Sequence, residues 1–223
     1  LDVGFGLGGN TLAALHQLRR ETAGAIAVTA LELDLRVLKA ARGIAPETDQ
    51  PVLTALEAGG RWEEPRGSVT LLSGDARATV RTLPEHEFDL IFLDAFSPDV
   101  NPELWSFHFL RQLRRVLARD GVLVTYSSAF PVRGALLKLG LAVGETTPFG
   151  RKRGGTIAAF DPARIETPLS AKERAIILSS TAGLPYSDRN LSATKPEIQA
   201  RRERILRRLR ARGVPKWAKF DRE

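Results

Sequence analysis

Three acidic residues, Glu32, Asp75 and Asp94, each end or directly follow an apolar segment of the sequence. Short apolar segments bounded by turn residues predict buried strands. A carboxylate at such a strand end can accept hydrogen bonds from ribose hydroxyls, from the amine of adenine, or from the amine of a substrate. Ligands of open α/β sheets bind beyond the carboxyl ends of the strands, so the three acids predict a single ligand site.

A glycine-rich loop, Gly4-Phe5-Gly6-Leu7-Gly8-Gly9, follows a predicted strand that ends at Val3. The loop opens a helix for which Asn10 is the expected cap. Glycines at this place let the backbone turn sharply and approach a ligand at the helix N-terminus. The glycines at positions 4, 6 and 9 match the nicotinamide pattern, and those at 4, 6 and 8 match the tighter methyltransferase pattern. The loop alone therefore predicts a nucleotide-like cofactor of either kind.

The first two acids narrow the choice of cofactor. Glu32 lies 23 residues after Gly9, where a carboxylate can bind both ribose hydroxyls and would repel a 2′-phosphate. Asp75 can accept the exocyclic amine of adenine. The alternatives are a surface acid at a strand end for Glu32 and a helix cap for Asp75. Together with the loop, both acids favour S-adenosylmethionine, with the binding residues Gly4, Phe5, Gly6, Gly8, Asn10, Glu32, Asp75 and Ala76.

The segment from Leu93 to Trp105 reads LDAFSPDVNPELW and is the most informative of the chain. Asp94 ends an apolar strand and is expected at the cofactor crevice, or else as a structural carboxylate that binds backbone amides. Two prolines stiffen the loop that follows. Phe96 and Trp105 offer flat surfaces on which a base could stack, although for Trp105 packing of the next helix is the preferred interpretation.

The order of elements predicts an α/β fold: a doubly wound, seven-stranded Rossmann-like methyltransferase sheet followed by a helical basic C-terminal extension. Strands are expected over residues 1–3, 25–33, 68–73, 88–93, 121–126, 141–145 and 156–160. Helices are expected over residues 10–20, 35–44, 102–118 and 132–139, with a short helix and a loop over 49–64. Beyond Pro162, a capping box at Ser170 and Glu173 predicts a helix that ends near Gly183, and a basic helix is expected over 196–212.

Composition excludes several classes of site. The chain of 223 residues has 43% hydrophobic and 26% charged residues, which is typical of a globular protein. It contains no Cys and three scattered His, so disulfides and thiolate metal sites are excluded and no bound metal is expected. No apolar run is long enough for a membrane helix, and no signal peptide is found. Because Met is absent and Leu1 lies just before the loop motif, we expect the native N-terminus to lie upstream.

The net charge of +7 is concentrated near the C-terminus. Between Pro196 and Glu223, ten Lys and Arg stand against four Asp and Glu, so the preceding residues are almost neutral. A second basic cluster is Arg151-Lys152-Arg153. This asymmetry predicts contact with a polyanion such as a nucleic acid, and the alternative is a solvated basic helix.

The loop after the fourth strand, the start Val3-Gly4-Phe5-Gly6 and the segment Phe149-Gly150-Arg151-Lys152-Arg153 together resemble the methyltransferase part of the MnmC family, over about residues 1 to 160. The part after Pro168 resembles stand-alone members that lack the fused oxidase. Where the family usually reads Leu-Asp-Gly-Phe-Ala-Pro, this chain has Leu-Asp-Ala-Phe-Ser-Pro.

The resemblance implies a cytoplasmic enzyme that uses S-adenosylmethionine to methylate the amine of 5-aminomethyl-(2-thio)uridine at the wobble position of tRNA. It implies that Asp94 is the catalytic acid, that Glu32 and Asp75 hold the cofactor, and that a separate oxidase protein supplies the aminomethyl substrate. We expect substrate contacts from Phe96, Pro98, Arg151, Lys152 and Arg153. The expected domains are residues 1–162, the methyltransferase, and 163–223, the extension.

Three alternatives stay open at this stage. A polyamine synthase-like aminopropyltransferase would share the sheet and an Asp-assisted attack by an amine. A non-catalytic tRNA-binding module would keep the fold without the chemistry. A nicotinamide-dependent oxidoreductase would share the glycine loop, but the sequence offers no hydride-handling site. Fold alone does not choose among these activities.

Overall fold

The computed structural model describes residues 1–148 and 154–217 of the chain. Internal contacts divide the chain into two compact units. Unit 1 comprises Leu1–Thr82 with Phe92–Asp94, and unit 2 comprises Leu83–Ile91 with Ala95–Glu223. One strand, β5, therefore contributes residues to both units. The domain boundary expected at residue 162 is not tested by this division and stays a prediction.

Unit 1 is built on a sheet with the strand order β3-β4-β2-β1-β5. β1 runs parallel to β2 and β5, and β2 runs parallel to β4. Parallel neighbours that are separated by crossover helices are typical of doubly wound α/β folds, so the predicted fold class is confirmed. The strands are β1 (Asp2–Val3), β2 (Ile26–Glu32), β3 (Arg61–Glu64), β4 (Gly67–Ser73) and β5 (Phe88–Leu93).

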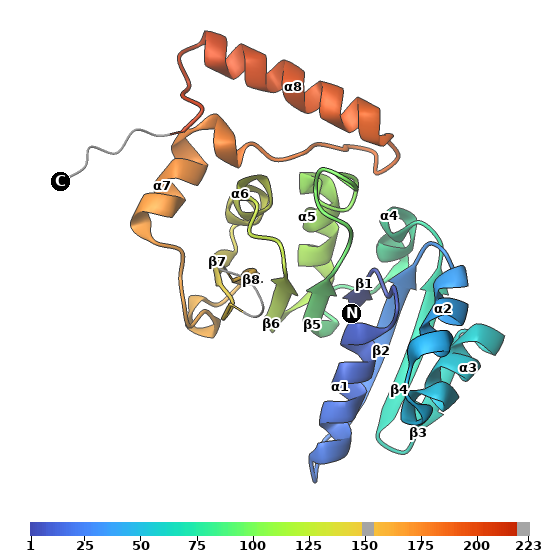
Figure 1. The fold of residues 1–223 in the computed structure, drawn as a ribbon. Coiled ribbons are helices and arrows are strands. Elements are labelled where there is room, and N and C mark those ends of the chain that lie inside the picture. Colours follow the sequence, from blue (N-terminus) through green and yellow to red (C-terminus); the bar gives the residue numbers. More distant parts are fainter. Residues whose placement is uncertain (149–153, 218–223) are drawn as a thin grey trace. The chain divides into compact units, whose positions relative to one another are not determined.

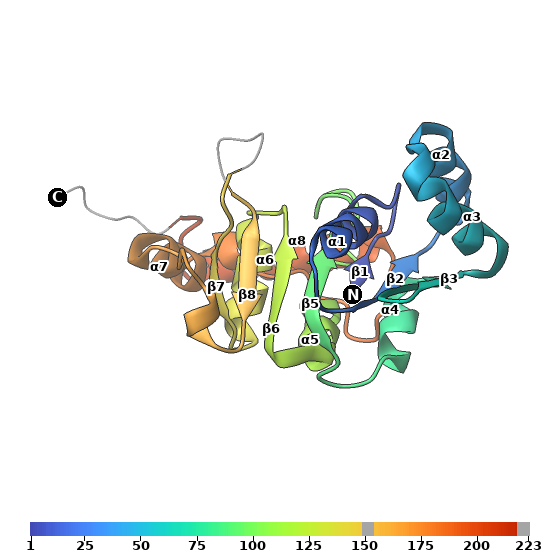
Figure 2. The same ribbon diagram turned by 90° about the horizontal axis from the view of Figure 1, so that it is seen from below.

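Helices of unit 1 lie on both sides of this sheet, with α1, α2 and α3 on one side and α4 on the other (Figure 2). Apolar side chains of α1 to α3 meet those of β2 and β4 in one buried cluster, in which Leu15, Val52 and Leu53 are fully buried. This cluster fixes the strand ends from which the acids project. The helices are α1 (Gly9–Arg20), α2 (Arg36–Ile44), α3 (Gln50–Gly59) and α4 (Ala76–Thr79), with 3₁₀ turns at Glu47–Asp49 and Val80–Thr82.

The strand count is eight in the described residues, one more than predicted. The additional strand is β3, which falls in the segment 49–64 that was expected to be helix and loop. β3 pairs antiparallel with β4 at the edge of the sheet, and its side chains alternate between exposed and half-buried. Two adjacent glutamates and an arginine hide that alternation in the sequence, because an edge strand buries little.

Unit 2 continues from the start of β5 with the order β5-β6-β8-β7, in which β8 is antiparallel to both β6 and β7. The closing pair of strands agrees with the expected hairpin-like ending. The strands are β6 (Leu117–Thr125), β7 (Ala142–Glu145) and β8 (Thr156–Ala159). The helices are α5 (Phe107–Val116), α6 (Phe130–Lys138), α7 (Ala171–Ser179) and α8 (Lys195–Ala211), with 3₁₀ turns at Pro162–Arg164 and Thr181–Gly183 (Figure 1).

Two boundaries in unit 2 differ from the prediction. α5 begins at Phe107 rather than Pro102, because the hydroxyl of Ser106 caps it by accepting the amide of Phe109 at 3.2 Å. β6 begins at Leu117, four residues before the predicted start at Gly121. Residues assigned to the end of a helix thus belong to a strand, which is a common error for short apolar segments.

The capping box predicted at Ser170 is half formed. The Ser170 hydroxyl accepts the Glu173 amide at 3.1 Å, but the Glu173 carboxylate binds Arg133 instead of turning back. A complete box stands at the start of α8, between Thr194 and Glu197. None of the helices in the described ranges combines the length and the apolarity that crossing a membrane requires.

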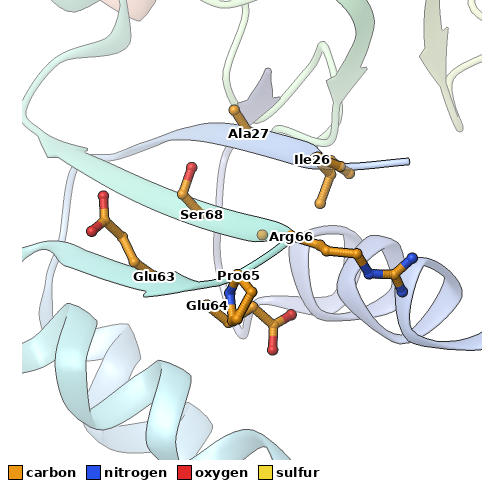
Figure 3. Close-up of a pocket in the computed structure, with 9 residues that line it drawn as sticks. Ile26, Ala27, Glu63, Glu64, Pro65, Arg66 and Ser68 are labelled. Carbon is orange, nitrogen blue, oxygen red and sulfur yellow. The ribbon is translucent and has the colours of Figure 1, made fainter. Parts of the chain in front are cut away.

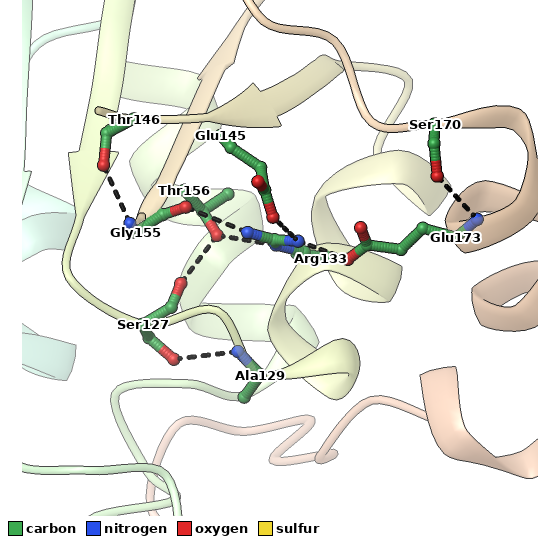
Figure 4. A network of polar contacts seen from close by, with 9 residues as sticks. All are labelled: Ser127, Ala129, Arg133, Glu145, Thr146, Gly155, Thr156, Ser170 and Glu173. Carbon is green, nitrogen blue, oxygen red and sulfur yellow. Dashed lines mark hydrogen bonds and ion pairs between the residues drawn. The ribbon is translucent and has the colours of Figure 1, made fainter. Parts of the chain in front are cut away.

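Arg133 of α6 is the centre of a buried polar cluster in unit 2 (Figure 4). Its side chain is 1% exposed and forms ion pairs with Glu145, at 2.9 Å, and with Glu173. It also donates to the Thr156 hydroxyl at 3.0 Å and to the Gly155 carbonyl at 2.9 Å. The guanidinium is therefore balanced by two carboxylates and two further acceptors, which is the condition under which a buried charge is tolerated.

Candidate active site

The carboxyl ends of three neighbouring strands in unit 1 lie level with one another. Val3 of β1 pairs with Leu31 of β2 and with Leu93 of β5. The next residue of each strand is therefore also level, and these residues are Gly4, Glu32 and Asp94. Because the strands are parallel, all three stand at one edge of the sheet, where ligands of such sheets bind. The loop, Glu32 and Asp94 thus lie at the edge of the sheet where the sequence predicts a ligand site.

Three glycines of the loop adopt left-handed backbone angles: φ is 88° at Gly4, 54° at Gly6 and 84° at Gly8. At Gly8 the requirement for glycine is also steric, since an added Cβ would lie 3.0 Å from the Phe5 ring. Gly9 has no such angle, and its Cβ would meet nothing within 4 Å. The structure therefore requires glycine at positions 4, 6 and 8, which is the methyltransferase spacing, and not at position 9.

Glu32 contacts the loop through its carboxylate. One oxygen accepts the amide of Gly6 at 2.9 Å, and the other accepts the amide of Asp34 at 2.9 Å. The side chain is half-buried. Each carboxylate oxygen has a second lone pair, so the group can still accept hydroxyl donors while it holds the loop.

Asp75 follows β4 and caps α4 by accepting the amide of Arg77 at 2.9 Å. The Arg77 guanidinium also binds this carboxylate, with a shortest distance of 2.7 Å. Burial alone would raise the pKa of Asp75, but the hydrogen bonds from Arg77 lower it below the usual value, so the group is anionic near neutral pH. The helix-cap alternative is therefore realised, and the side chain, 43% exposed, also remains open to solvent. Ala76, beside it, is buried.

Asp94 faces the start of α1. Its carboxylate accepts the side-chain amide of Asn10 at 3.1 Å, and its backbone amide donates to the Val3 carbonyl at 3.0 Å. Asn10 was expected to cap α1, and that prediction is wrong, because the cap position is Gly8 and Asn10 lies inside the first turn. The Asn10 side chain is thus directed at carboxylates rather than at the helix end.

A fourth acid, Asp2 of β1, lies beside Asn10 and was not predicted from the sequence. Its side chain is buried, accepts the Thr11 hydroxyl at 2.7 Å and lies 3.4 Å from the Asn10 amide nitrogen. Burial raises the pKa of Asp2 to about 6, although the hydrogen bonds from Thr11 and Asn10 oppose the shift. The available signal was an acid enclosed by Leu1 and Val3 in a buried strand, where carboxylates are uncommon.

A pocket of about 420 Å³ in unit 1 lies away from this edge (Figure 3). It is lined by the first residues of β2 and β4, by the end of β3 and by the turn formed by Pro65 and Arg66. Ile26 and Gly67 form the first pair of the β2–β4 ladder, whereas Glu32 and Ser73 form the last. The pocket is thus at the amino ends of the strands, opposite the edge that carries the acids. In the described ranges no group of three acidic or histidine side chains is arranged to hold a metal.

The loop after Asp94 belongs to unit 2, and hydrogen bonds to its backbone carbonyls hold it in place. The Trp105 indole donates to the Phe96 carbonyl at 2.7 Å, and the Tyr126 hydroxyl donates to the Ala95 carbonyl at 2.9 Å. Trp105 is fully buried, so the packing interpretation is confirmed. The Phe96 side chain is 77% exposed. The loop therefore presents one aromatic ring to solvent from a firmly held backbone.

The other predicted substrate residues are placed less favourably or not at all. Pro98 is buried in unit 2. Arg151, Lys152 and Arg153 lie outside the described residues, so their predicted role stays a prediction.

Helix α8 carries arginines of two kinds. Arg201 donates to the Ser187 carbonyl at 2.8 Å and Arg202 to the Leu184 carbonyl at 3.1 Å, so both hold the preceding segment. The side chains of Ile198 and Leu206 are buried on the same helix. A second group is exposed and its side chains make no hydrogen bond or ion pair within the described part of the chain: Arg204, Arg207, Arg208 and Arg210.

Known proteins are similar to this chain in sequence and in fold. Residues 47–161 match a family described as S-adenosyl-L-methionine-dependent methyltransferase. A protein of Methanocaldococcus jannaschii is 31% identical over 219 residues, which cover 94% of this chain and 60% of that protein. The bifunctional protein MnmC of Ralstonia nicotianae, for tRNA 5-methylaminomethyl-2-thiouridine biosynthesis, is 36% identical over 133 residues, or 56% of this chain and 20% of that protein.

The crystal structure of MnmC2 from Aquifex aeolicus superposes with a TM-score of 0.78 and 32% identity, over 93% of this chain and 67% of that chain. The chain thus spans 60% of the archaeal relative and a fifth of the bifunctional one. The likeness extends over most of the described elements of both units.

Proposed function

The chain belongs to the MnmC-type family of S-adenosyl-L-methionine-dependent methyltransferases, and on this premise we propose that it methylates the amine of 5-aminomethyl-(2-thio)uridine at the wobble position of tRNA. The observation that carries the proposal is the edge of unit 1, where a glycine loop of methyltransferase spacing stands level with Glu32 and Asp94. The name of the Ralstonia relative supplies the substrate class.

The residues at this edge fit the cofactor. Glu32 holds the loop through Gly6 and keeps lone pairs for the two ribose hydroxyls. Asp75, anionic at the end of β4, is assigned to the amine of adenine, with Arg77 fixing its orientation. Gly4 and Gly8 allow the backbone to approach the ligand, and Phe5 packs beneath the loop. When bound, S-adenosylmethionine supplies a methyl group that its sulfonium already activates.

The chain's task is then to present a neutral amine. An aminomethyl group is mostly protonated near neutral pH and attacks only after losing its proton. The exposed carboxylate of Asp94 binds the ammonium and accepts, or relays to water, the proton that the nitrogen releases. As the new N–C bond forms, the same negative charge stabilises the positive charge that grows on nitrogen. Methyl transfer from sulfur to nitrogen and proton release to Asp94 balance the reaction.

The proposed partner is tRNA, and the described residues that support this are in unit 2. The exposed ring of Phe96 is assigned to stacking on a base. Three exposed arginines of α8 that have no side-chain partner in the described residues, Arg204, Arg207 and Arg208, are assigned to phosphates. A separate oxidase protein as the source of the aminomethyl group, and the cytoplasm as the compartment, follow from the family resemblance and belong to the same proposal.

The test is methylation of tRNA that carries the 5-aminomethyl group, with labelled S-adenosylmethionine and mass analysis of the wobble nucleoside. The wild-type protein should add one methyl group to that nucleoside. Asp94→Asn should lower the rate by about 100-fold or more, because the proton acceptor is lost. Its affinity for S-adenosylmethionine should change little.

Asp89→Asn is the matched control, since Asp89 lies on the same strand with an exposed side chain and away from this edge. It should retain full activity. Labelling of another nucleoside, or none, by the wild-type protein would contradict the proposed substrate, and full activity of Asp94→Asn would remove this residue from the mechanism. Transfer from decarboxylated cofactor instead would favour aminopropyl chemistry.

A further inference from the structure

We propose that Asn10 is a positioning residue for Asp94, and that it holds the Asp94 carboxylate through an amide anchored on the buried carboxyl of Asp2. The inference rests on the proposed function only in assigning Asp94 to the reaction. The hydrogen bonds that define the arrangement all lie within unit 1.

The geometry gives the Asn10 amide two acceptors. Its nitrogen lies 3.1 Å from an Asp94 oxygen and 3.4 Å from an Asp2 oxygen. An amide nitrogen carries two hydrogens, so one can be directed at each carboxylate. The other oxygen of Asp2 accepts the Thr11 hydroxyl at 2.7 Å. The Asp2 carboxyl is therefore held by two consecutive residues of α1, Asn10 and Thr11. The contact with Asp2 in turn fixes the position of the Asn10 side-chain amide.

Asp94 needs such an anchor because its own surroundings do not restrict it. The residue is exposed, and Asn10 provides its one hydrogen bond to a side chain in the described part of the chain. An exposed aspartate without such a contact samples several rotamers, and the carboxylate points in a different direction in each. Holding the group in one orientation raises the fraction of encounters with reactive geometry. The anchor itself is rigid, since β1 is paired on both sides.

The electrostatics agree with this arrangement. Burial raises the pKa of Asp2, and the nearby charge of Asp94 raises it further. The hydrogen bonds from Thr11 and Asn10 lower it. The Asn10 amide lies between the two carboxyl groups and can donate to both, which offsets part of this unfavourable interaction.

Kinetics of Asn10→Leu, which keeps the side-chain volume but has no donor, test the positioning role. We expect kcat for methyl transfer to fall about tenfold or more, with the KM for S-adenosylmethionine nearly unchanged, because orientation and not cofactor binding is lost. Asn10→Gln, which restores an amide with a longer reach, should recover part of the rate. Gln17→Leu, which removes an exposed amide from the same helix, is the matched control and should behave like wild type.

A second readout needs no activity. The pKa of Asp2, followed by carboxyl-carbon NMR, should rise above about 6 in Asn10→Leu, which loses a donor, and fall in Asp94→Asn, which loses a repelling charge. A wild-type protein that leaves tRNA unmethylated while these shifts occur would contradict the proposed substrate but support the link between the three side chains. Unchanged kcat in Asn10→Leu, or an unchanged Asp2 pKa in both variants, would overturn the inference.

Discussion

Unit 1 and unit 2 each bury a charged side chain among polar neighbours, and the two clusters balance their charges differently. Around Arg133 of unit 2, two carboxylates, a hydroxyl and a carbonyl satisfy one guanidinium. Around Asn10 of unit 1, two carboxylates share one neutral amide, and one of them, Asp94, is exposed. In the first cluster each carboxylate is paired with the same buried cation, so both acids are used within the fold. The second retains negative charge at the edge of a sheet, where a cationic substrate could use it.

The same contrast recurs within α8. Arg201 and Arg202 bind backbone carbonyls and hold the segment before the helix. Arg204, Arg207 and Arg208 have no partner in the described residues. An arginine that binds other groups of the chain stabilises the fold, whereas an exposed arginine without such a partner is available to bind a ligand. Substitutions within each cluster test this distinction separately.

The largest effect is expected at Arg133. Arg133→Met keeps much of the side-chain volume but leaves the carboxylates of Glu145 and Glu173 without their cation. Removing one partner of a buried ion pair commonly costs about 3–5 kcal/mol of unfolding free energy. Denaturant unfolding measures this, with the exposed Arg164→Met as control. A loss below about 1 kcal/mol would show that the charge balance of this cluster does not stabilise unit 2.

A smaller, pH-dependent effect is expected at Asp2. Its folded-state pKa of about 6 exceeds the unfolded value of 3.8, so the folded protein binds this proton more tightly. The stability that this carboxyl contributes is therefore complete below about pH 4 and is lost as the pH rises through 6. At about 1.4 kcal/mol per pKa unit, the loss is roughly 2–3 kcal/mol.

The check is the free energy of unfolding of wild type and of Asp2→Asn between pH 4 and pH 8. The difference between them should shift in favour of the variant as the pH rises, whereas Asp89→Asn reports the change due to losing an exposed carboxyl. A difference that is constant across this range would mean that Asp2 is not an uncompensated buried acid.

The smallest effect concerns α8 and RNA. Replacing Arg204, Arg207 and Arg208 together by Gln should weaken tRNA binding several-fold at low salt and reduce the salt dependence by as much as about three phosphate contacts. Binding isotherms at several salt concentrations measure both quantities. The control removes three exposed cations of unit 1, Arg20, Lys39 and Arg81. If both triple variants lost the same tRNA affinity, the contribution of α8 would be due to its net charge alone and not to specific contacts.

Local patterns in the sequence predicted the strand–loop–helix frame well. The strand over residues 88–93 was predicted with its observed bounds, and the glycine loop and the acids at the strand ends were found because their spacing is a property of the chain itself. The cluster around Asn10 was not predicted. Asparagine before a helix reads as a cap, and only the pairing of β1 with β5 brings Asp94, 84 residues away, against it.

The burial of Arg133 and its ion pairs were not predicted, for a related reason. A single arginine in an apolar helix reads as a surface residue, and its partners Glu145 and Glu173 lie 12 and 40 residues further along the chain. Periodicity reports which face of an element is apolar, but it does not report which distant group will neutralise a buried charge. Such contacts depend on the tertiary fold.

The hydrogen bond from Gly6 to Glu32 has a further consequence for recognition. This bond joins the middle of the glycine-rich loop to the end of β2. Glycine has more backbone freedom than any other residue, so without this bond the loop would sample many conformations. A segment that is already confined loses less conformational entropy when a ligand arrives. Glu32 would thus contribute to affinity twice, through its own lone pairs and by reducing the ordering that the loop must still undergo.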